Sequence, residues 1–379
     1  MKKIVFMTGT RADFGKLKNL ILKVQDNPSF QCHTFVTGMH LLGTYGHTYT
    51  EVERAGIKNL YKFINQQRGT EADIILSNTI LGFSNYIQEI KPDLIIVHGD
   101  RVEALACAIV GSFNSILVGH IEGGEVSGTL DELTRHAISK LAHIHFVSNE
   151  LAKKRLLQMG EREESVFTIG SPDIDVMLNG SLPEISEVKK HYDIGFDSYY
   201  VLLYHPVTSE YNQTRENVKK VVAGCLSSGF NFVVIYPNND KGSEIILDEY
   251  EAFRGNSNFR VLPSMRFESF LSLLKHSKGI VGNSSAGIRE ACVFGVPALN
   301  IGSRQDNRSK CESILHVNED ETEICKNLVM LQNISVPCSF EFGDGTSTAK
   351  FIKIIEDDEV WETPQQKQFV DLLYGREPI

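Results

Sequence analysis

The sequence alternates short apolar runs with segments of helical pattern along almost its whole length of 379 residues. Runs such as 94–97 and 232–235 are apolar at every position, so neither face of the strand they would form suits water. Strands buried on both faces are typical of parallel sheets that helices cover on both sides. The segment 16–24, which follows the first run, repeats leucine, isoleucine and valine at helical spacing. The alternation therefore predicts doubly wound α/β sheets.

The predicted strands fall into two groups, separated by a turn at 170–173 and the polar residues behind it. A chain of this length also suits two cores better than one. We therefore predict an N-terminal domain over residues 1–171, a C-terminal domain over 172–356, and a C-terminal segment, 357–379, whose helix over 359–373 packs back on the first domain. The predicted strands are 3–7, 33–37, 94–98, 116–121, 145–148 and 166–170 in the first group, and 200–204, 232–236, 260–262, 279–282 and 298–301 in the second.

Composition excludes several classes of function. The formal net charge of -10 leaves no basic surplus to neutralise nucleic-acid phosphates. No apolar stretch is long enough to span a bilayer, and the N-terminus lacks a signal-peptide pattern. The seven cysteines are scattered without a CxxC pair, which predicts reduced core residues and a cytoplasmic protein. No metal-ligand cluster and no GxGxxG after the first strand is present, so neither a metal nor a dinucleotide cofactor is expected.

In open α/β sheets, ligands bind beyond the carboxyl ends of the strands. The first such loop, 8–16 (Thr-Gly-Thr-Arg-Ala-Asp-Phe-Gly-Lys), opens a helix. Its glycine permits a tight turn, a helix N-terminus favours anions, and Arg11 and Lys16 add positive charge. A capped helix start with solvated charges explains the same residues equally well.

Two further loops carry acids. Asp100 follows the strand 94–98, and Glu122 follows the strand 116–121 within His-Ile-Glu-Gly-Gly-Glu. Turn chemistry accounts for the glycines, but it does not account for two acids at the same edge of one sheet.

A third acid, Asp131, stands at the start of a helical pattern. An ordinary surface pair with Arg135, four residues on, is by itself the simpler interpretation. Together with Asp100 and Glu122, however, it provides three carboxylates near one wall of a cleft between the domains. Crowded carboxylates shift each other's pKa and suit proton transfer.

The second domain supplies His205, directly after the strand 200–204, and a polar turn followed by a helix at 282–291. A single histidine is more often structural than catalytic. The amides and hydroxyls of the turn suit a pyrophosphate, and Glu290 suits ribose hydroxyls. Phe270 suits the flank of a nucleotide base, although core packing explains it as well. The predicted ligand-binding residues of this domain are Phe270, Ser284, Ser285, Gly287 and Glu290.

Taken together, the segments 8–16, 98–101, 120–125 and 282–290 resemble, in order, those of hydrolysing UDP-N-acetylglucosamine 2-epimerases of bacterial sialic acid synthesis. The resemblance runs from the first strand to the C-terminal segment. It implies a glycosyltransferase-B-like fold, in which two Rossmann-like domains face a cleft and UDP lies mostly on the second. It also implies anti-elimination of UDP to a glycal, followed by hydration to N-acetylmannosamine.

The resemblance implies a role for each matched residue. Asp100, Glu122 and Asp131 become catalytic acids and bases, and His205 a catalytic residue on the phosphate or leaving-group side. Ser284, Ser285 and Glu290 become UDP ligands, with Arg11 near the phosphates and Lys16 a further substrate-binding residue.

The sequence departs from the non-hydrolysing branch, whose first loop resembles Gly-Thr-Arg-Pro-Glu and whose acid loop resembles Glu-Ala-Gly-Leu-Arg. Here Ala12–Asp13 and Gly123–Gly124 stand instead, and Asp131 replaces a glutamate. These departures favour a free sugar as the product.

Three alternatives remain open on sequence. A related branch acts on UDP-N,N'-diacetylbacillosamine for legionaminic acid and has nearly the same motifs. A UDP-sugar glycosyltransferase shares the fold and the nucleotide motif. A two-lobed sugar-binding module without catalysis is the third. In each case the predicted partner is a UDP-sugar or sugar, without nucleic acid or membrane, and we expect a homodimer or higher homo-oligomer.

Overall fold

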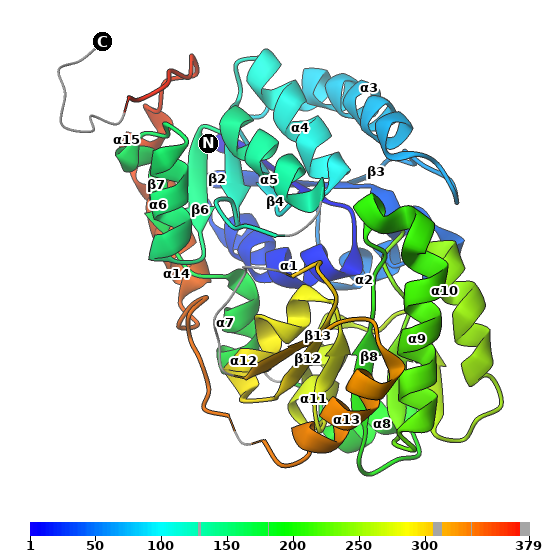
Figure 1. Ribbon diagram of the computed structural model, residues 1–379. Coiled ribbons are helices and arrows are strands. Elements are labelled where there is room, and N and C mark those ends of the chain that lie inside the picture. Colours follow the sequence, from blue (N-terminus) through cyan, green and yellow to red (C-terminus); the bar gives the residue numbers. More distant parts are fainter. Residues whose placement is uncertain (128–129, 181, 306–312, 335, 372–379) are drawn as a thin grey trace. The chain divides into compact units, whose positions relative to one another are not determined.

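The computed structural model describes residues 1–127, 130–180, 182–305, 313–334 and 336–371 (Figure 1). The chain forms two compact units. Unit 1 comprises Met1–Glu125, Asp131–Asn179 and Glu341–Ile379, and unit 2 comprises Val126–Leu130 and Gly180–Phe340.

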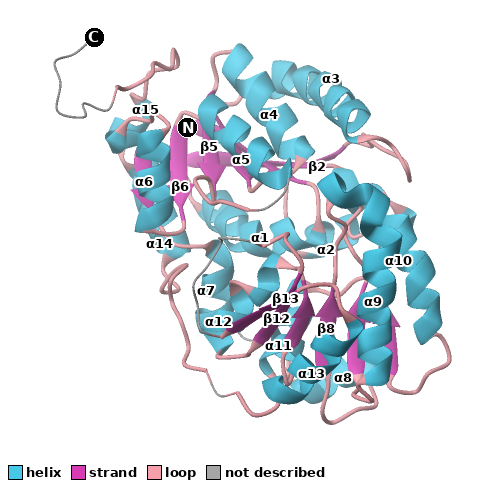
Figure 2. Ribbon diagram, viewed as in Figure 1, coloured by secondary structure: helices cyan, strands magenta, loops and turns pink. Residues whose placement is uncertain are grey.

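Unit 1 is built on a parallel sheet, whose strands are magenta in Figure 2. Its described residues form seven strands, in the order β3-β2-β1-β4-β5-β6-β7. The strand order turns back at β1 and β4, as in a doubly wound sheet. The strands are β1 (Lys2–Thr8), β2 (Phe30–Val36), β3 (Leu60–Lys62), β4 (Leu94–His98), β5 (Leu117–Ile121), β6 (Ile144–Val147) and β7 (Val166–Thr168).

Helices cover both faces of this sheet. They are α1 (Arg11–Asp26), α2 (Tyr49–Arg54), α3 (Ala72–Ile90), α4 (Val102–Phe113), α5 (Leu130–Leu141), α6 (Glu150–Gln158), α7 (Pro172–Asn179), α14 (Ser347–Glu356) and α15 (Asp358–Trp361), with the short 3-10 helices η1 (Gly38–Leu41), η2 (Gly43–Tyr45) and η3 (Glu163–Ser165).

Strand β1 shows why both faces are apolar. Ile4 and Phe6 point into a core shared with α1 and α14, where Phe351 packs. Val5 and Met7 point into the opposite core, shared with α3, α4 and α5. All four strand residues are buried, each contributing about 1.5–3 kcal/mol of transfer free energy. The two cores hold the strand ends, and thus the loops that follow them, in fixed positions.

Unit 2 repeats this plan with a parallel sheet of six strands among its described residues, in the order β10-β9-β8-β11-β12-β13. The strands are β8 (Tyr200–Leu203), β9 (Phe232–Ile235), β10 (Phe259–Leu262), β11 (Ile280–Gly282), β12 (Ala298–Ile301) and β13 (Ile314–Val317). The helices are α8 (Ile185–Tyr192), α9 (Thr214–Ser227), α10 (Ser243–Tyr250), α11 (Phe267–Lys275), α12 (Glu290–Phe294) and α13 (Glu321–Leu331), with η4 (Thr208–Gln213), η5 (Glu251–Phe253) and η6 (Ser285–Gly287).

Every strand predicted from the sequence is present, with its ends moved by a few residues at most. Two strands were not predicted, β3 and β13. Each lies at an edge of its sheet, where two of three residues are exposed in β3 and only Ile314 is fully buried in β13. Edge strands lack the continuous apolar run on which the prediction depended.

The division of the chain differs from the predicted one. The boundary was placed at 171/172, but α7 contacts α1 and α14 and belongs to unit 1, so the change falls after Asn179. The chain returns to unit 1 at Glu341 rather than at residue 357.

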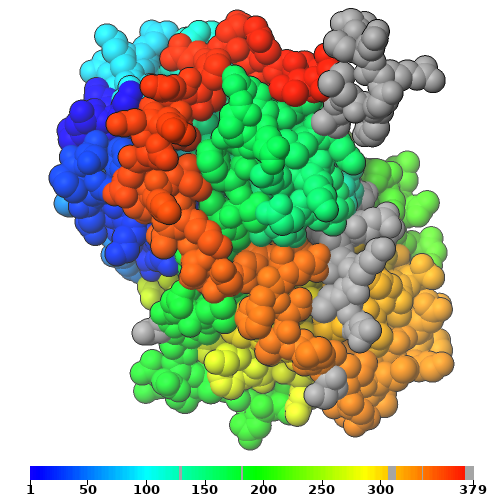
Figure 3. Space-filling model, turned by 90° about the vertical axis from the view of Figure 1, so that its left-hand side faces the viewer, coloured from blue at the N-terminus to red at the C-terminus, as the bar shows by residue number. Residues whose placement is uncertain are grey.

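The predicted helix over 359–373 is wrong. Helix α15 ends at Trp361, residues 362–371 are not helical, and 372–379 lie outside the described residues. The longer C-terminal helix of unit 1 is α14, whose Phe351 and Ile355 are buried in the core. In Figure 3 this C-terminal part, orange to red, lies against the blue N-terminal part of unit 1. The run of charged and polar residues beyond Trp361 gives no apolar face to hold a longer helix.

The cysteine prediction is correct in part. The buried ones are Cys32, Cys107, Cys225 and Cys292; Cys325 is half-buried, Cys338 is exposed, and Cys311 lies outside the described residues.

Candidate active site

Two of the predicted acids follow neighbouring strands of unit 1. Asp100 follows β4 and Glu122 follows β5, and these strands pair in parallel with His98 opposite Ile121. Both loops therefore leave the same edge of the sheet side by side, as predicted from the sequence.

The third acid is brought to this edge by a helix. Asp131 lies half-buried in the first turn of α5. One turn further, the buried Arg135 donates to the Asp100 carboxylate and, at 3.3 Å, to the backbone oxygen of Glu125. The guanidinium thus ties the helix that carries Asp131 to the loop that carries Asp100. The simple surface pair considered for Arg135 is not its main role, because its side chain is buried against Asp100.

The Glu122 side chain is held by contacts from three segments of unit 1. The Ser171 hydroxyl donates to Oε1, and His98 Nε2 lies 3.0 Å from Oε2. Lys16 Nζ lies 3.5 Å from both carboxylate oxygens and 3.0 Å from Asp173 Oδ2. Glu122 is buried, so the ammonium group beside it is the charge that balances its carboxylate. The structure thus brings Lys16 and Glu122 together.

The backbone at Glu122 is in the left-handed region, at φ 63°. Residues other than glycine rarely adopt this conformation, which costs of order 1–3 kcal/mol and is seen most often at functional sites. It is sustained here by the side-chain contacts of a buried carboxylate.

Sequence reasoning missed three residues of this cluster: His98, Ser171 and Asp173. The last two belong to the Gly-Ser-Pro-Asp turn at 170–173, which was interpreted only as a domain boundary. Its position directly after β7 was the available signal, since strand-end loops of one sheet share an edge.

The first loop is organised by its own side chains. Thr10 Oγ1 accepts from the Asp13 amide at 3.1 Å, while the Asp13 carboxylate accepts from the Thr10 and Gly9 amides at 3.1 and 3.0 Å. This capping box begins α1 and explains Asp13 as a structural residue. Arg11 stands half-buried beside it and pairs with Glu51 of α2 at 2.7 Å.

In unit 2, His205 follows β8 and is half-buried. The backbone amide of Asn238 donates to His205 Nδ1 at 3.0 Å. Nδ1 is therefore an acceptor, and the proton of the neutral ring is on Nε2. His205 therefore presents a donor at Nε2.

The polar turn that follows β11 is joined to His205. The Asn283 side chain accepts from the His205 amide at 2.6 Å and donates to the His205 carbonyl at 2.9 Å. Asn283 is fully buried, and its side chain holds the backbone of the His205 loop against the turn that follows β11. The structure thereby places the predicted histidine beside the predicted nucleotide turn.

The turn itself differs from the predicted strand, turn and helix in one respect. A 3-10 helix, η6, lies between the strand and a short α12, and Glu290 is the first residue of α12. The amides of Ala286, Gly287 and Ile288 donate to Ser284 or Ser285 within the turn. These amides are used internally, and the partly exposed Ser284 and Ser285 are the groups left to meet a ligand. Glu290 is buried.

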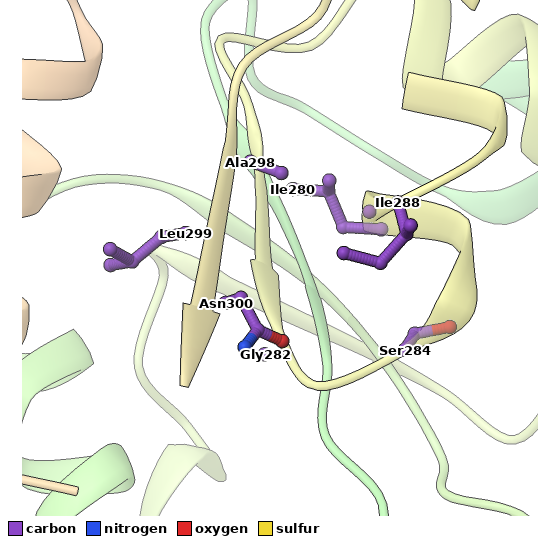
Figure 4. Close-up of a pocket in the computed structure, with 8 residues that line it drawn as sticks. Ile280, Gly282, Ser284, Ile288, Ala298, Leu299 and Asn300 are labelled. Atoms are coloured by element: carbon purple, nitrogen blue, oxygen red, sulfur yellow. The ribbon is translucent and has the colours of Figure 1, made fainter. Parts of the chain in front are cut away.

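A small pocket lies behind this turn, between β11, β12 and η6 (Figure 4). Its wall is mainly apolar: it is lined by Ile280, Gly282, Ser284, Gly287, Ile288, Ala298, Leu299 and Asn300. A Cβ added at Gly287 would meet Ala298 and Ile280 at 3.4 and 3.5 Å, which is ordinary contact. Packing alone therefore does not require glycine here.

Phe270 lies in α11 and is buried, with 9% of its surface exposed. This placement agrees with the core interpretation, and its proposed contact with a base stays a prediction. Within the described ranges, no three His, Cys, Asp or Glu residues are placed to hold a metal ion. Over the same ranges, no helix combines the length and apolarity needed to cross a membrane.

Comparisons with known proteins agree on one family. A sequence model described as UDP-N-acetylglucosamine 2-epimerase matches residues 22–356. A UDP-N-acetylglucosamine 2-epimerase of Neisseria meningitidis is 46% identical over 98% of this chain and 100% of its own length. A hydrolysing UDP-N,N'-diacetylbacillosamine 2-epimerase of Legionella pneumophila is 32% identical over 94% and 96%. The polysialic acid biosynthesis protein P7 of Escherichia coli is 31% identical over 98% of each chain.

Among solved structures, a Methanocaldococcus jannaschii UDP-GlcNAc 2-epimerase in complex with UDP-GlcNAc and UDP has a TM-score of 0.82, over 94% of this chain and 99% of its own. At 21% identity this likeness shows the fold, and it confirms the predicted glycosyltransferase-B-like architecture of two α/β domains. From the family match over residues 22–356 and the full-length relative, it follows that the chain belongs to the UDP-N-acetylglucosamine 2-epimerase family.

Proposed function

We propose that this chain is a hydrolysing 2-epimerase, which converts UDP-N-acetylglucosamine and water to N-acetylmannosamine and UDP. The observation that carries the proposal is the set of strand-end carboxylates in unit 1. Asp100 and Glu122 leave neighbouring strands, and each is in contact with a cation, Arg135 and Lys16 respectively. Such a set supplies both a base and an acid at one edge of a sheet.

The reaction assigns a part to each predicted residue. One of the three carboxylates, Asp100, Glu122 or Asp131, takes the proton from C2 as the bond from C1 to the UDP oxygen breaks. The product of this elimination is a glycal. Water then adds its hydroxyl at C1, and a protonated acid returns a proton to C2 on the opposite face.

Leaving-group departure requires that charge be stabilised on the diphosphate. We assign this task to the hydroxyls of Ser284 and Ser285, to His205 through its Nε2 proton, and to Arg11. Glu290 accepts from ribose hydroxyls, Phe270 and Gly287 line the nucleotide side, and Lys16 serves the sugar side beside Glu122. No metal has a part in this scheme.

The hydrolysing mode is supported by the Glu-Gly-Gly sequence at 122–124. A Cβ added at Gly123 would lie 2.8 Å from both His120 Nδ1 and Ser139 Oγ. Gly124 has φ +76°, and a Cβ there would lie 2.4 Å from the Ala152 oxygen. The alanine that the non-hydrolysing branch has in its Glu-Ala-Gly would stand at position 123, where its Cβ would be too close to His120 and Ser139 in this packing, whereas position 124 is glycine in both branches. Two relatives, at 32% and 31% identity, are named as hydrolysing enzymes.

The choice of sugar is supported by the order of similarity. The Neisseria relative named for UDP-N-acetylglucosamine is 46% identical, against 32% for the Legionella relative named for the diacetylbacillosamine substrate. A role in sialic acid synthesis is supported by the likeness to protein P7. A homo-oligomer in the cytoplasm remains our prediction.

The testing experiment is incubation with UDP-N-acetylglucosamine, and in parallel with its 4-acetamido-4,6-dideoxy analogue, without any acceptor. We expect free N-acetylmannosamine and an equal amount of UDP from the first substrate. Preferred turnover of the second would transfer the proposal to the legionaminic acid branch. UDP release that depends on an added acceptor would show a glycosyltransferase instead.

A further inference from the structure

The buried His120 occupies the junction between all three acid-bearing segments of unit 1. It stands near the end of β5 and is 0% exposed. Its Nε2 lies 2.7 Å from the Gly99 carbonyl oxygen, and its Nδ1 lies 3.0 Å from the Ser139 hydroxyl.

These two contacts fix the tautomer. A carbonyl oxygen can only accept, so Nε2 carries the proton and donates to Gly99. Burial lowers the pKa of His120 to about 3, so the ring is neutral near pH 7 and Nδ1 accepts from the Ser139 hydroxyl. The imidazole therefore forms two directed hydrogen bonds of defined polarity.

Each bond reaches a segment that carries a predicted acid. Gly99, which has φ +70°, directly precedes Asp100. Ser139 lies on α5, whose first turn holds Asp131. His120 itself stands two residues before Glu122, on the same strand and loop.

The Glu122 loop also packs against the side chains of His120 and Ser139. A Cβ at Gly123 would come within 2.8 Å of both His120 Nδ1 and Ser139 Oγ. The backbone of the residue after Glu122 thus rests directly on the hydrogen bond between the two side chains. Glu122, which directly precedes Gly123, is itself in the left-handed conformation.

We infer that His120, through Gly99 and Ser139, is a positioning residue that sets the relative placement of Asp100, Glu122 and Asp131. This inference rests on the proposed function, since it assigns the three carboxylates to one reaction. Displacements near 1 Å at reacting groups commonly cost about 100-fold in rate. A neutral imidazole with both nitrogens hydrogen-bonded suits this purpose, because it remains uncharged near pH 7.

The test uses the full-length protein and four variants: His120→Ala, His120→Gln, Ser139→Ala and Ser112→Ala. Glutamine offers an N–H toward Gly99 and a carbonyl toward Ser139, so it can restore both bonds. Ser112→Ala is the matched control. The Ser112 hydroxyl, on α4, donates at 2.7 Å to the carbonyl of Leu141 at the end of α5, the helix that also carries Ser139, and this bond does not involve an acid loop. The readouts are kcat and KM for UDP-N-acetylglucosamine, UDP affinity by calorimetry, and melting temperature.

We expect kcat of His120→Ala to fall by about 10–100-fold, with KM and UDP affinity within about twofold of wild type. Ser139→Ala should lose about 3–10-fold in kcat, and His120→Gln should recover most of the loss. Ser112→Ala should keep kcat within about twofold.

Wild-type kcat in a folded His120→Ala variant would overturn the inference. If that variant does not fold, Ser139→Ala decides: a loss no greater than that of Ser112→Ala overturns it. Asp100→Asn and Glu122→Gln are assayed in parallel. Full activity in both would contradict the proposed function itself. Loss of activity in both, together with full activity in the His120 and Ser139 variants, would contradict only this inference.

Discussion

The hydroxyl of Ser171 donates a hydrogen bond to the carboxylate of Glu122, although the two residues are 49 positions apart in the sequence. Ser171 follows β7 and Glu122 follows β5, and these two strands are separated in the sheet of unit 1 by β6 alone. The bond occupies Oε1, while His98 lies next to Oε2. The carboxylate is therefore held at both oxygens, as expected for a group whose direction matters to a reaction.

Removal of the Ser171 hydroxyl tests this relationship. In Ser171→Ala we expect a loss of about 3–30-fold in kcat, because a hydrogen bond to a charged group is worth about 1.5–3 kcal/mol and part of it positions Glu122. Ser171→Thr, which keeps the hydroxyl, should retain most of the activity. Equal activity in Ser171→Ala and wild type would show that Glu122 is held adequately by its other contacts.

The three acids are tested together by neutral replacements of the same shape. Asp100→Asn, Glu122→Gln and Asp131→Asn should each lose about 10²–10⁴-fold in turnover, the usual share of a proton-transfer group. Their UDP affinities should stay close to that of wild type, because all the assigned UDP ligands except Arg11 lie in unit 2. The melting temperatures of Asp100→Asn and Glu122→Gln should fall, because the buried Arg135 and Lys16 each lose a charged partner. Three variants with wild-type rates would contradict the assignment.

Glu290→Ala tests the nucleotide assignment. The loss of a charge-assisted hydrogen bond to the ribose should weaken UDP binding by roughly 1.5–3 kcal/mol, which is about 10–100-fold in Kd. Glu323→Ala, an exposed change in the first turn of α13, serves as the control and should leave Kd unchanged. Calorimetry that shows equal UDP affinity in both variants would exclude Glu290 as a ligand.

Some features of the fold and the site could be predicted from local sequence patterns, and others depend on how distant segments are arranged in the sheet. The interior strands were predicted because 94–97 and 232–235 are apolar at every position, a pattern typical of strands buried on both faces of a parallel sheet. The acids were found because they follow these strands directly. The partners of Glu122 were not found, because a contact between Ser171 and Glu122 depends on the order of strands in the sheet. The local sequence pattern of neither segment indicates the order of the strands.

The buried histidines predict how stability depends on pH. Burial lowers the pKa of His40 from 6.5 to about 4 and that of His120 from 6.5 to about 3. Between these values the unfolded chain binds more protons than the folded one, so the free energy of unfolding falls as pH falls from 6.5 toward 4. Each histidine contributes at most about 1.4 kcal/mol per pH unit.

Melting temperatures between pH 7 and pH 4.5 check this. They should fall steadily over the window, and His40→Gln should show a shallower decline than wild type. His40 forms hydrogen bonds with the hydroxyls of Thr8 and Thr48 within 3.0 Å, and the Asp13 carboxylate lies 4.0 Å from its Nε2. An identical slope in the variant would mean that other groups govern the acid limb.

Isotope labelling tests the mechanism itself. The C2 proton of the sugar is weakly acidic, since no carbonyl adjoins C2 on the ring, so its removal is feasible only as the C1–O bond breaks. UDP is a good leaving group, and its growing charge is stabilised by the Ser284–Ser285 turn in our scheme. A carboxylic acid in contact with water exchanges its proton quickly, so the proton returned to C2 should come from solvent. Turnover in D₂O should therefore give free N-acetylmannosamine with deuterium at C2 and an equal amount of UDP.

Turnover in H₂¹⁸O should place the label at C1 of the sugar and leave UDP unlabelled, because water attacks the glycal and not the phosphorus. Entry of ¹⁸O into UDP would show cleavage of the P–O bond, and original hydrogen retained at C2 would show that no elimination occurs there. If UDP-N-acetylmannosamine were the main product, the nucleotide would have returned to C1. The close packing of Gly123 on His120 and of Gly124 on Ala152 would then not be what separates the two branches.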